Sequence, residues 1–321
     1  MVNDCYIAID TGGTKIAGAL VGASGNILHQ DTVYLGGKSG KEAAAVLMKL
    51  LRSLQSRARE ADLRSRGAGV CIPGIVYHES GNVWAPNIPG WENYPLRTEL
   101  RKELGGDMRI RIDSDRACAI LGETWKGAAQ GCRDAIFVAV GTGIGAGILV
   151  NGKIMRGHRD IAGATGWMAL KPPYEHKYEA CGCFEYYASG DGIARTAAEV
   201  LEKYPDYQGI LRKKDLRAED VFSAFEQSDP VAAECFDRVI ELWGMAAANY
   251  VSLFNPEKII FGGGIFGPAA RFLPRIAEEA KKWAQPIGIT QVSLEASRLG
   301  KDAGLFGAAR LAMTTETKDS A

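Results

Sequence analysis

A unit of strand, glycine-rich turn and strand occurs twice in this chain and limits the folds that it can adopt. The first copy covers Tyr6–Val21, with its turn at Thr11–Lys15. The second covers Ala135–Val150, with its turn at Gly141–Gly147, and Asn151-Gly152 after it is a strong hairpin signal. Because the copies begin about one domain length apart, the sequence predicts two related halves.

Strand and helix patterns alternate along the rest of the chain. Residues 41–63 place Ala44, Leu47 and Leu51 on one face and charged side chains on the other, which is typical of an amphipathic helix. The alternation predicts an α/β fold. We expect further helices over residues 96–104, 117–126, 269–283 and 303–313, strands over residues 69–72, 109–113, 258–261 and 290–295, and an irregular loop over residues 157–190.

Composition excludes several classes of protein. The 38 basic and 38 acidic residues cancel, so no broad field favours nucleic acid or an acidic membrane surface. No apolar run approaches the ~20 residues of a membrane helix, and the N-terminus shows no secretory pattern. We therefore expect a cytoplasmic protein without nucleic-acid or membrane partners. Most of its 7 cysteines are expected to be buried, reduced thiols, namely Cys5, Cys71, Cys118, Cys132 and Cys235.

The turn at residues 12–15 is a candidate phosphate site. It leads into a second strand and not into a helix, which disfavours both a Walker loop and a dinucleotide loop. Free backbone N–H groups of Gly12 and Gly13 would form an anion nest beside Thr14 and Lys15, and Asp10 would hold Mg²⁺ through water. An ordinary glycine hairpin is the alternative. The second turn favours the phosphate interpretation, because two such hairpins can grip one phosphate chain.

Three other motifs complete the candidate chemistry. The triple glycine 262–264 would let the backbone approach a flat base such as adenine. Asp115 follows a strand and precedes a helix, so it is either a helix cap or the base that accepts a proton from an attacking hydroxyl. Asn87, in a kinked loop that ends at Trp91, offers a polar group and an aromatic face for a sugar.

These motifs resemble the ROK family, the bacterial sugar kinases of the actin-like ATPase superfamily. The resemblance covers nearly the whole chain and rests on the order and spacing of nine short motifs. They are Asp10–Lys15, Pro86–Trp91, Ile112–Asp115, Leu121–Glu123, Gly141–Gly145, Ala162–Gly166, Phe184-Glu185, Gly262–Gly264 and Asp302–Gly304.

The resemblance implies a two-domain actin-like ATPase (ribonuclease H-like) fold with an interdomain cleft. Residues 1–115 with about 303–315 would form a small domain, residues 116–302 a larger one, and residues 316–321 a frayed tail. It implies an ATP- and Mg²⁺-dependent hexose kinase that forms a homodimer, with Asp115 as the base. The implied ATP contacts are Gly12, Gly13, Thr14, Lys15, Gly141, Thr142, Gly143, Gly145, Gly262, Gly263 and Gly264, and Asn87 and Glu185 match sugar contacts.

The chain departs from the family pattern where the sugar should bind. Ser114 stands in place of the usual Asn and has a hydroxyl in place of an amide. Ala164 and Trp167 replace a glutamate and a histidine, so we expect a more apolar pocket in which a sugar can stack on Trp167. A sugar hydroxyl that faces an indole without a partner costs about 1–3 kcal/mol. Glucose should therefore bind less well than a deoxy, anhydro or otherwise modified hexose.

The same departures affect the family's zinc motif. A structural zinc takes four nitrogen or sulfur ligands, and only Cys181 and Cys183 remain in place. We expect no structural zinc, although His176 with Glu175 or Glu179 is a possible substitute set. Two alternatives to a kinase stay open, a sugar-binding regulator and a degenerate kinase that binds nucleotide without turnover. The absence of a helix-turn-helix before the first turn disfavours the former, and the intact Asp10 and Asp115 disfavour the latter.

Overall fold

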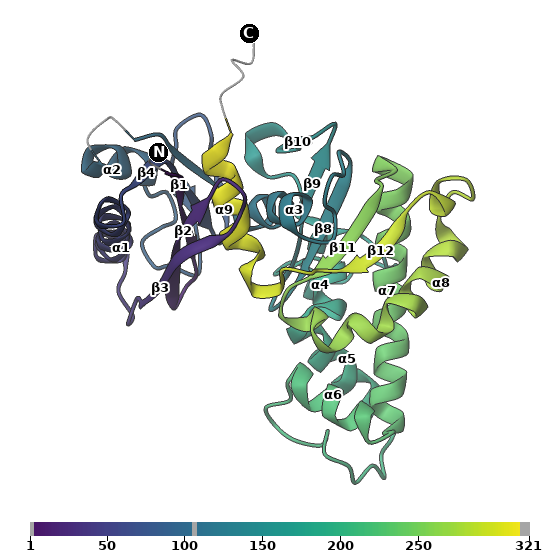
Figure 1. Cartoon of the computed structure of the whole chain (residues 1–321). Coiled ribbons are helices and arrows are strands. Elements are labelled where there is room, and N and C mark those ends of the chain that lie inside the picture. The colour runs from purple at the N-terminus through teal and green to yellow at the C-terminus, as the bar shows by residue number, and fades with distance from the viewer. Residues whose placement is uncertain (1–2, 105–107, 315–321) are drawn as a thin grey trace. The chain divides into compact units, whose positions relative to one another are not determined.

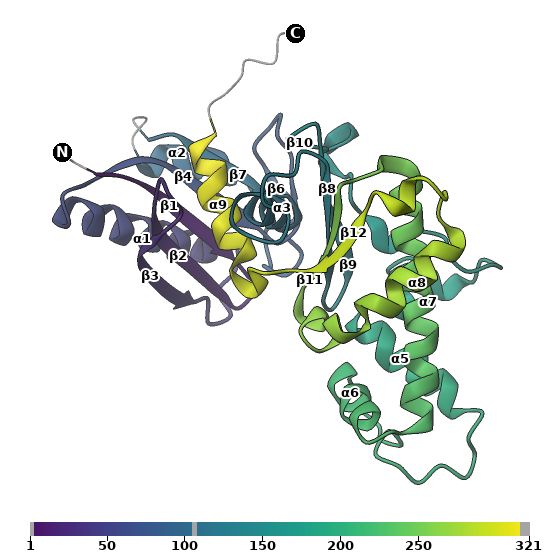
Figure 2. The ribbon, with the colours of Figure 1, turned by 45° about the vertical axis from the view of Figure 1, so that its right-hand side comes forward.

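The computed structural model describes residues 3–104 and 108–314, and the chain divides into two compact units. The first unit contains Met1–Gly131, Arg156–Ala162 and Asp302–Ala321, and the second contains Cys132–Met155 and Gly163–Lys301. The expected assignment of residues 116–302 to one domain is wrong for residues 116–131 and 156–162, which belong to the first unit. For residues 156–162 the cause is the set of contacts with Asp113 and His78. For residues 116–131 the cause is that helix α3 (Asp115–Lys126) packs along α9 (Ala303–Met313), as both ribbon views show (Figure 1, Figure 2). The expected tail lies outside the described residues.

The first unit is built on a five-stranded sheet of order β3-β2-β1-β4-β7. Strand β1 pairs antiparallel with β2 and parallel with β4, and β4 pairs parallel with β7. The strands are β1 (Asn3–Thr11), β2 (Lys15–Gly22), β3 (Ile27–Tyr34), β4 (Leu63–Ile72) and β7 (Ile110–Ser114), and a small ribbon is formed by β5 (Ile75–Val76) and β6 (Val83–Trp84).

Helices cover this sheet with the faces that the periodicity predicts. Helix α1 (Gly40–Glu60) buries Ala44, Leu47, Leu51 and Leu54 in the same core as Ile7 and Ile9 of β1. Helix α2 (Leu96–Leu104) has the predicted bounds. Helix α9 packs on β1 and β4, so the last helix of the chain completes the first unit.

The second unit repeats the strand order of the first, as β10-β9-β8-β11-β12. Strands β8 and β9 are antiparallel, whereas β8, β11 and β12 run parallel. The two related halves predicted from the glycine turns are therefore confirmed. The strands are β8 (Ala135–Val140), β9 (Ile144–Val150), β10 (Lys153–Ile154), β11 (Lys258–Gly262) and β12 (Ser293–Ala296). Asn151 and Gly152, at φ 51° and 74°, form the predicted β9–β10 turn.

A helical layer follows β10 in the second unit. Its helices are α4 (Cys183–Ala188), α5 (Gly190–Leu201), α6 (Ala218–Glu226), α7 (Pro230–Phe254) and α8 (Leu273–Trp283), and α7 and α8 lie side by side (Figure 2). Asp229 caps α7 through hydrogen bonds from two backbone N–H groups. Short 3₁₀ helices lie at His158–Asp160, Thr165–Trp167, His176–Tyr178, Gly264–Phe266, Pro268–Phe272, Gly288–Thr290 and Gly300–Asp302.

Three local expectations need correction. Residues 157–190 are not irregular throughout, because α4 begins at Cys183 and 3₁₀ turns precede it. The helix expected from residue 269 begins as a 3₁₀ turn and becomes α-helical at Leu273. All seven cysteines are free, and of the five expected to be buried, Cys132 is only half-buried. In the described part of the chain, no helix is long and apolar enough to cross a membrane.

Candidate active site

Parallel strands bring the first group of candidate residues to one edge of the first sheet. Strands β1, β4 and β7 run in the same direction, so their carboxyl ends meet there. Asp10 lies near the end of β1, and Ser114 ends β7 directly before Asp115. This edge is where open α/β sheets bind their ligands.

The half-buried Asp10 lies against the beginning of α9. A Cβ atom on Gly304 would come within 2.7 Å of Asp10 Oδ2, so only glycine lets this helix approach so closely. Burial raises the pKa of Asp10, and a hydrogen bond from the Cys71 thiol opposes the rise. The carboxylate is an oxygen donor of the kind that Mg²⁺ prefers, and Mg²⁺ sites commonly take one or two carboxylates with phosphate oxygens. Asp10 therefore fits the implied metal.

The carboxylate of Asp115 is the first side chain of α3 and remains half exposed, with 52% of its surface accessible. Its Oδ1 accepts a hydrogen bond from the backbone N–H of Arg116 at 2.8 Å. Desolvation raises its pKa to about 6, the charge and the backbone N–H of Arg116 oppose the rise, and the charge of Asp10 adds to it. The cap of α3 is Ser114, whose Oγ accepts from the N–H of Ala117 at 3.2 Å. The helix-cap interpretation of Asp115 is therefore wrong, and its carboxylate is available for proton transfer.

The first glycine turn lies against the loop that carries Asn87. The turn is closed by a 2.9 Å hydrogen bond from Gly12 N to Lys15 O, which leaves Gly13, Thr14 and Lys15 exposed. A Cβ atom on Gly13 would lie 2.7 Å from the carbonyl oxygen of Asn87. The structure thus brings together a predicted phosphate residue and a predicted sugar residue.

Trp91, at the end of that loop, does not offer its face to a sugar. It is fully buried, stacks on Tyr94 with ring centroids 5.3 Å apart, and donates Nε1–H to the carbonyl of Gly40 at 2.9 Å. This expectation is wrong because the ring fills the core beneath α1. Asn87 itself is exposed.

A buried ion pair, which sequence reasoning missed, lies beside Asp115. Arg156 Nη1 donates to Asp113 Oδ1 at 2.7 Å, its Nη2 lies 2.7 Å from Asp113 Oδ2, and Asp113 is almost fully buried. In the same segment, Asp160 accepts from the backbone N–H of His78 at 2.9 Å and lies 2.7 Å from His78 Nδ1. Through these contacts, residues 156–162 pack as part of the first unit. No sequence signal pairs Arg156 with Asp113, because 43 residues separate them.

The second glycine turn connects β8 and β9. Gly141 N donates to Gly143 O at 2.9 Å, and the N–H of Gly190, the first residue of α5, donates to Gly141 O at 2.7 Å. Thr142 is exposed at the tip, whereas Gly145 is buried within β9. The turn therefore offers Thr142 and open backbone at Gly141, where an added Cβ would meet nothing within 4 Å.

The triple glycine lies beside this turn, because β8 and β11 are parallel neighbours. Gly263 has φ +88°, and a Cβ atom there would lie 2.4 Å from Val140 O. A Cβ atom on Gly262 would meet the Phe137 ring at 2.4 Å. Only Gly264 faces open space, so Gly262 and Gly263 are needed for packing and Gly264 alone leaves room for a ligand.

Glu185 lies against the base of the second turn. Its Oε2 accepts from the N–H of Ile144 at 2.6 Å and would lie within 2.9 Å of a Cβ atom on Gly143 or Gly166. Burial raises the pKa of Glu185, and the hydrogen bond from Ile144 opposes the rise. The two glycines thus leave room for a carboxylate that is held in one orientation.

The residues near Trp167 do not fit a zinc ion. The Cys181 and Cys183 thiols lie closest to backbone carbonyls, and His176 pairs with Glu179 at 2.8 Å on the surface. Over residues 3–104 and 108–314, no three His, Cys, Asp or Glu side chains are arranged to hold a metal. Trp167, for its part, is 57% exposed and lines a pocket of about 590 Å³.

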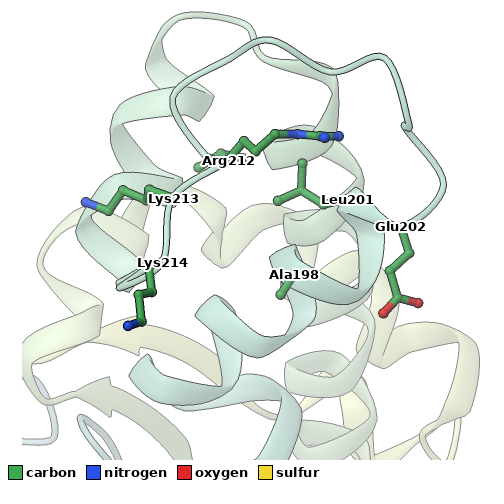
Figure 3. Close-up of a pocket in the computed structure, with 7 residues that line it drawn as sticks. Ala198, Leu201, Glu202, Arg212, Lys213 and Lys214 are labelled. Atoms are coloured by element: carbon green, nitrogen blue, oxygen red, sulfur yellow. The ribbon is translucent and has the colours of Figure 1, made fainter.

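A second pocket of about 510 Å³ lies between α5 and the segment before α6 (Figure 3). Figure 3 shows Lys213 and Lys214 pointing to one side and Arg212 extending toward the side of Glu202. The guanidinium of Arg212 donates to the carbonyls of Tyr204 and Pro205, and Lys213 pairs with Asp220 at 2.8 Å. Because Arg212 and Lys213 already have partners, the pocket is a poor candidate for phosphate.

The chain has two α/β units of equal strand order, with glycine turns after strands of both sheets and an exposed carboxylate at the first sheet edge. This is the two-domain actin-like ATPase fold. The model of the ROK family matches residues 6–315. The chain belongs to the ROK family.

Known proteins of this family are similar along their whole length. A glucokinase of Halalkalibacterium halodurans is 32% identical over 313 residues, which cover 94% of this chain and 93% of the relative. The crystal structure of a ROK hexokinase from Thermus thermophilus has a TM-score of 0.79 at 28% identity and covers 96% and 97% of the two chains. A ROK glucokinase from Streptomyces griseus, solved with glucose and AMPPNP, has a TM-score of 0.73 at 29% identity and covers 96% and 99%.

Proposed function

We propose that this protein is an ATP-dependent kinase that transfers the γ-phosphate of ATP to a hydroxyl of a hexose or a modified hexose. The observation that carries the proposal is the exposed Asp115 carboxylate at the sheet edge of a ROK-family chain. The relatives reported above are named glucokinase and hexokinase, and one of them binds glucose with an ATP analogue. These names favour a kinase that turns over its substrate. They disfavour a protein that only binds nucleotide and a sugar-binding regulator.

Each unit contributes a distinct part of the chemistry. In the first unit, Asp115 accepts the proton of the attacking hydroxyl, and the backbone N–H groups of Gly13 and Thr14 bind phosphate oxygens, since that of Gly12 already donates to Lys15. In the second unit, the turn at residues 141–145 binds phosphate, and Gly264 leaves room for the base of ATP. Asn87, Ser114, Trp167 and Glu185 contact the sugar. Ser114 can still donate its hydroxyl proton, because its cap bond uses Oγ only as an acceptor.

The metal, the assembly and the location belong to the same proposal. Asp10 would hold Mg²⁺ through water, and the bound ion would neutralise charge on the phosphates. The homodimer and the cytoplasmic location rest on the family resemblance and on the sequence. Zinc has no part in the proposal, because the side chains near Cys181 and Cys183 do not fit it.

Glucose should be a poor substrate, because the Ala164 side chain has no polar group and the Trp167 indole cannot accept a hydrogen bond from a hydroxyl. A hydroxyl without a partner costs about 1–3 kcal/mol, which corresponds to roughly a five- to 150-fold loss of affinity. A glucose efficiency typical of good hexokinases would contradict this part of the proposal and leave the kinase activity intact.

The test is an ADP-release assay over hexoses, amino sugars, deoxy sugars and polyols. We expect turnover of at least one hexose or modified hexose, loss of turnover in Asp115→Asn by about three orders of magnitude or more, and an unchanged Kd for ATP. Asp237→Asn, which changes an exposed carboxylate on α7, is the control and should retain activity. Retained turnover in Asp115→Asn would remove Asp115 from the mechanism, and no turnover of any sugar would refute the kinase.

A further inference from the structure

The pocket beside Trp167 lies wholly within the second unit and has a volume of about 590 Å³. That volume is in the range of sites that hold small molecules. Its most exposed rings are those of Trp167 and Tyr174, at 57% and 67%. Lys171 and Glu179 add one positive and one negative charge to the lining. The pocket therefore combines exposed aromatic rings with charged hydrogen-bonding groups.

One wall of this pocket, Trp167, belongs to the 3₁₀ turn that contacts Glu185. Gly166 precedes Trp167 in the 3₁₀ turn, and a Cβ atom on Gly166 would lie 2.9 Å from Glu185 Oε2. A Cβ atom on Gly182, which also lines the pocket, would lie 2.4 Å from the Cα of Trp167. One turn of backbone thus contacts the proposed sugar-binding carboxylate through Gly166 and lines the pocket through Trp167.

The two tyrosines that line the pocket have hydroxyls that are already hydrogen-bonded. Tyr174 donates its hydroxyl to Glu179 at 3.1 Å, and Tyr178 donates to Glu175 at 2.9 Å. The ammonium of Lys171 lies 4.3 Å above the Tyr187 ring, which holds the charge at the pocket. A pyranose ring has an apolar C–H face and an edge of hydroxyls. Such a ring matches aromatic walls with charged groups better than a purely apolar group does.

We propose that this pocket receives a second sugar ring of the substrate, so that the enzyme phosphorylates a hexose carried on a disaccharide in preference to the free hexose. The inference rests on the proposed kinase function and names its substrate class. Stacking on one or two aromatic rings is worth enough to raise kcat/KM about tenfold.

The experiment compares ADP release on glucose with release on maltose, cellobiose, trehalose and sucrose, with phenyl glucoside as the apolar comparator. We expect at least one disaccharide to exceed glucose in kcat/KM about tenfold. Tyr174→Ala removes one wall, and Ala169→Phe fills the pocket from its exposed lining. Each should lower kcat/KM for that disaccharide about tenfold and change the value for glucose less than about twofold. Tyr34→Ala, at a similarly exposed tyrosine of the first unit, should change neither value.

Several results would overturn the inference. They are a free hexose that matches or exceeds every disaccharide, a preference for phenyl glucoside over the disaccharides, and equal losses on both substrates in the two variants. Calorimetric binding of the same sugars in the presence of AMPPNP separates this failure from failure of the kinase. Tighter binding of a disaccharide that depends on Tyr174 supports the pocket even without turnover, whereas equal or weaker binding refutes it.

Discussion

At the residue scale, Asp115 shows how a carboxylate that a sequence would assign to a helix cap becomes available for catalysis. Ser114 caps α3, so the Asp115 side chain is left half exposed. Desolvation and the nearby charge of Asp10 favour its neutral form and raise its pKa to about 6. A base near this value ionises at neutral pH and still accepts a proton effectively.

The raised pKa of Asp115 predicts the acid limb of the pH profile. Asp115 must be ionised to accept a proton, so kcat/KM should be level above pH 6 and fall about tenfold per pH unit below the pKa of about 6. Initial rates measured from about pH 4.5 to about pH 8, in buffers of constant ionic strength, give this profile of kcat/KM. A level profile down to about pH 5 would contradict the assignment.

The same raised pKa predicts that the ionised Asp115 carboxylate, which catalysis needs, lowers the stability of the folded protein. Because the folded pKa lies above the ordinary value of 3.8, the ionised carboxylate destabilises the fold, and the cost appears as pH rises from about 4 to about 6. Asp115→Asn should therefore be at least as stable as the wild type at pH 8. Thermal unfolding of both proteins at pH 4.5 and 8 measures this, and a lower melting temperature of the variant at pH 8 would show that the charged form stabilises the fold.

At the scale of elements, the contact of α3 with α9 holds the first unit together. A Cβ atom on Gly307 of α9 would lie 1.7 Å from the carbonyl oxygen of Cys118 on α3. Gly304, one turn earlier, leaves the same helix free to approach Asp10. The two glycines thus connect the packing of α9 with the position of the proposed metal-binding carboxylate.

Gly307→Ala should destabilise the protein, because the added methyl group forces α9 away from α3. Overpacking of this kind costs about 1–3 kcal/mol. The melting temperature should fall by several degrees, and kcat should fall with it, since α9 also lies against Asp10. Gly267→Ala is the control, because Gly267 has φ −69° and its Cβ would meet no atom closer than 3.9 Å. If both variants melt within about 1 °C of the wild type, the helices have room to separate.

At the scale of the whole molecule, the order of the chain and the order of the units differ. The first unit begins at the N-terminus but takes its last helix from Ala303–Met313. In that helix, Leu305 and Ala308 share a core with Ala8 of β1 and Cys71 of β4. The first unit therefore lacks part of its core until the rest of the chain has been made.

A fragment that ends at Lys301 tests this arrangement. Without α9, one face of β1 and β4 loses its apolar cover, so we expect fast amide exchange in the first sheet. Strands β8 and β11 should keep their protection, because the second unit retains all of its own elements. Hydrogen exchange of the fragment and the full chain measures both sheets. Equal protection of β1 in the two would show that the first unit folds without α9.

Much of this protein follows from the sequence because local signals are strong where a strand meets a glycine turn. The two repeated units, the face of α1 and the bounds of α2 depend on periodicity and turn chemistry within a few residues. Tertiary structure decided the rest. Assignment of α3 to the first unit depends on α9, which follows it by almost two hundred residues, and the Asp113–Arg156 pair joins distant segments. Trp91 is a core residue because α1 offers it a carbonyl, and no local pattern distinguishes that role from a sugar platform. Packing, burial and desolvation arise from neighbours distant in the chain, so only the folded molecule sets them.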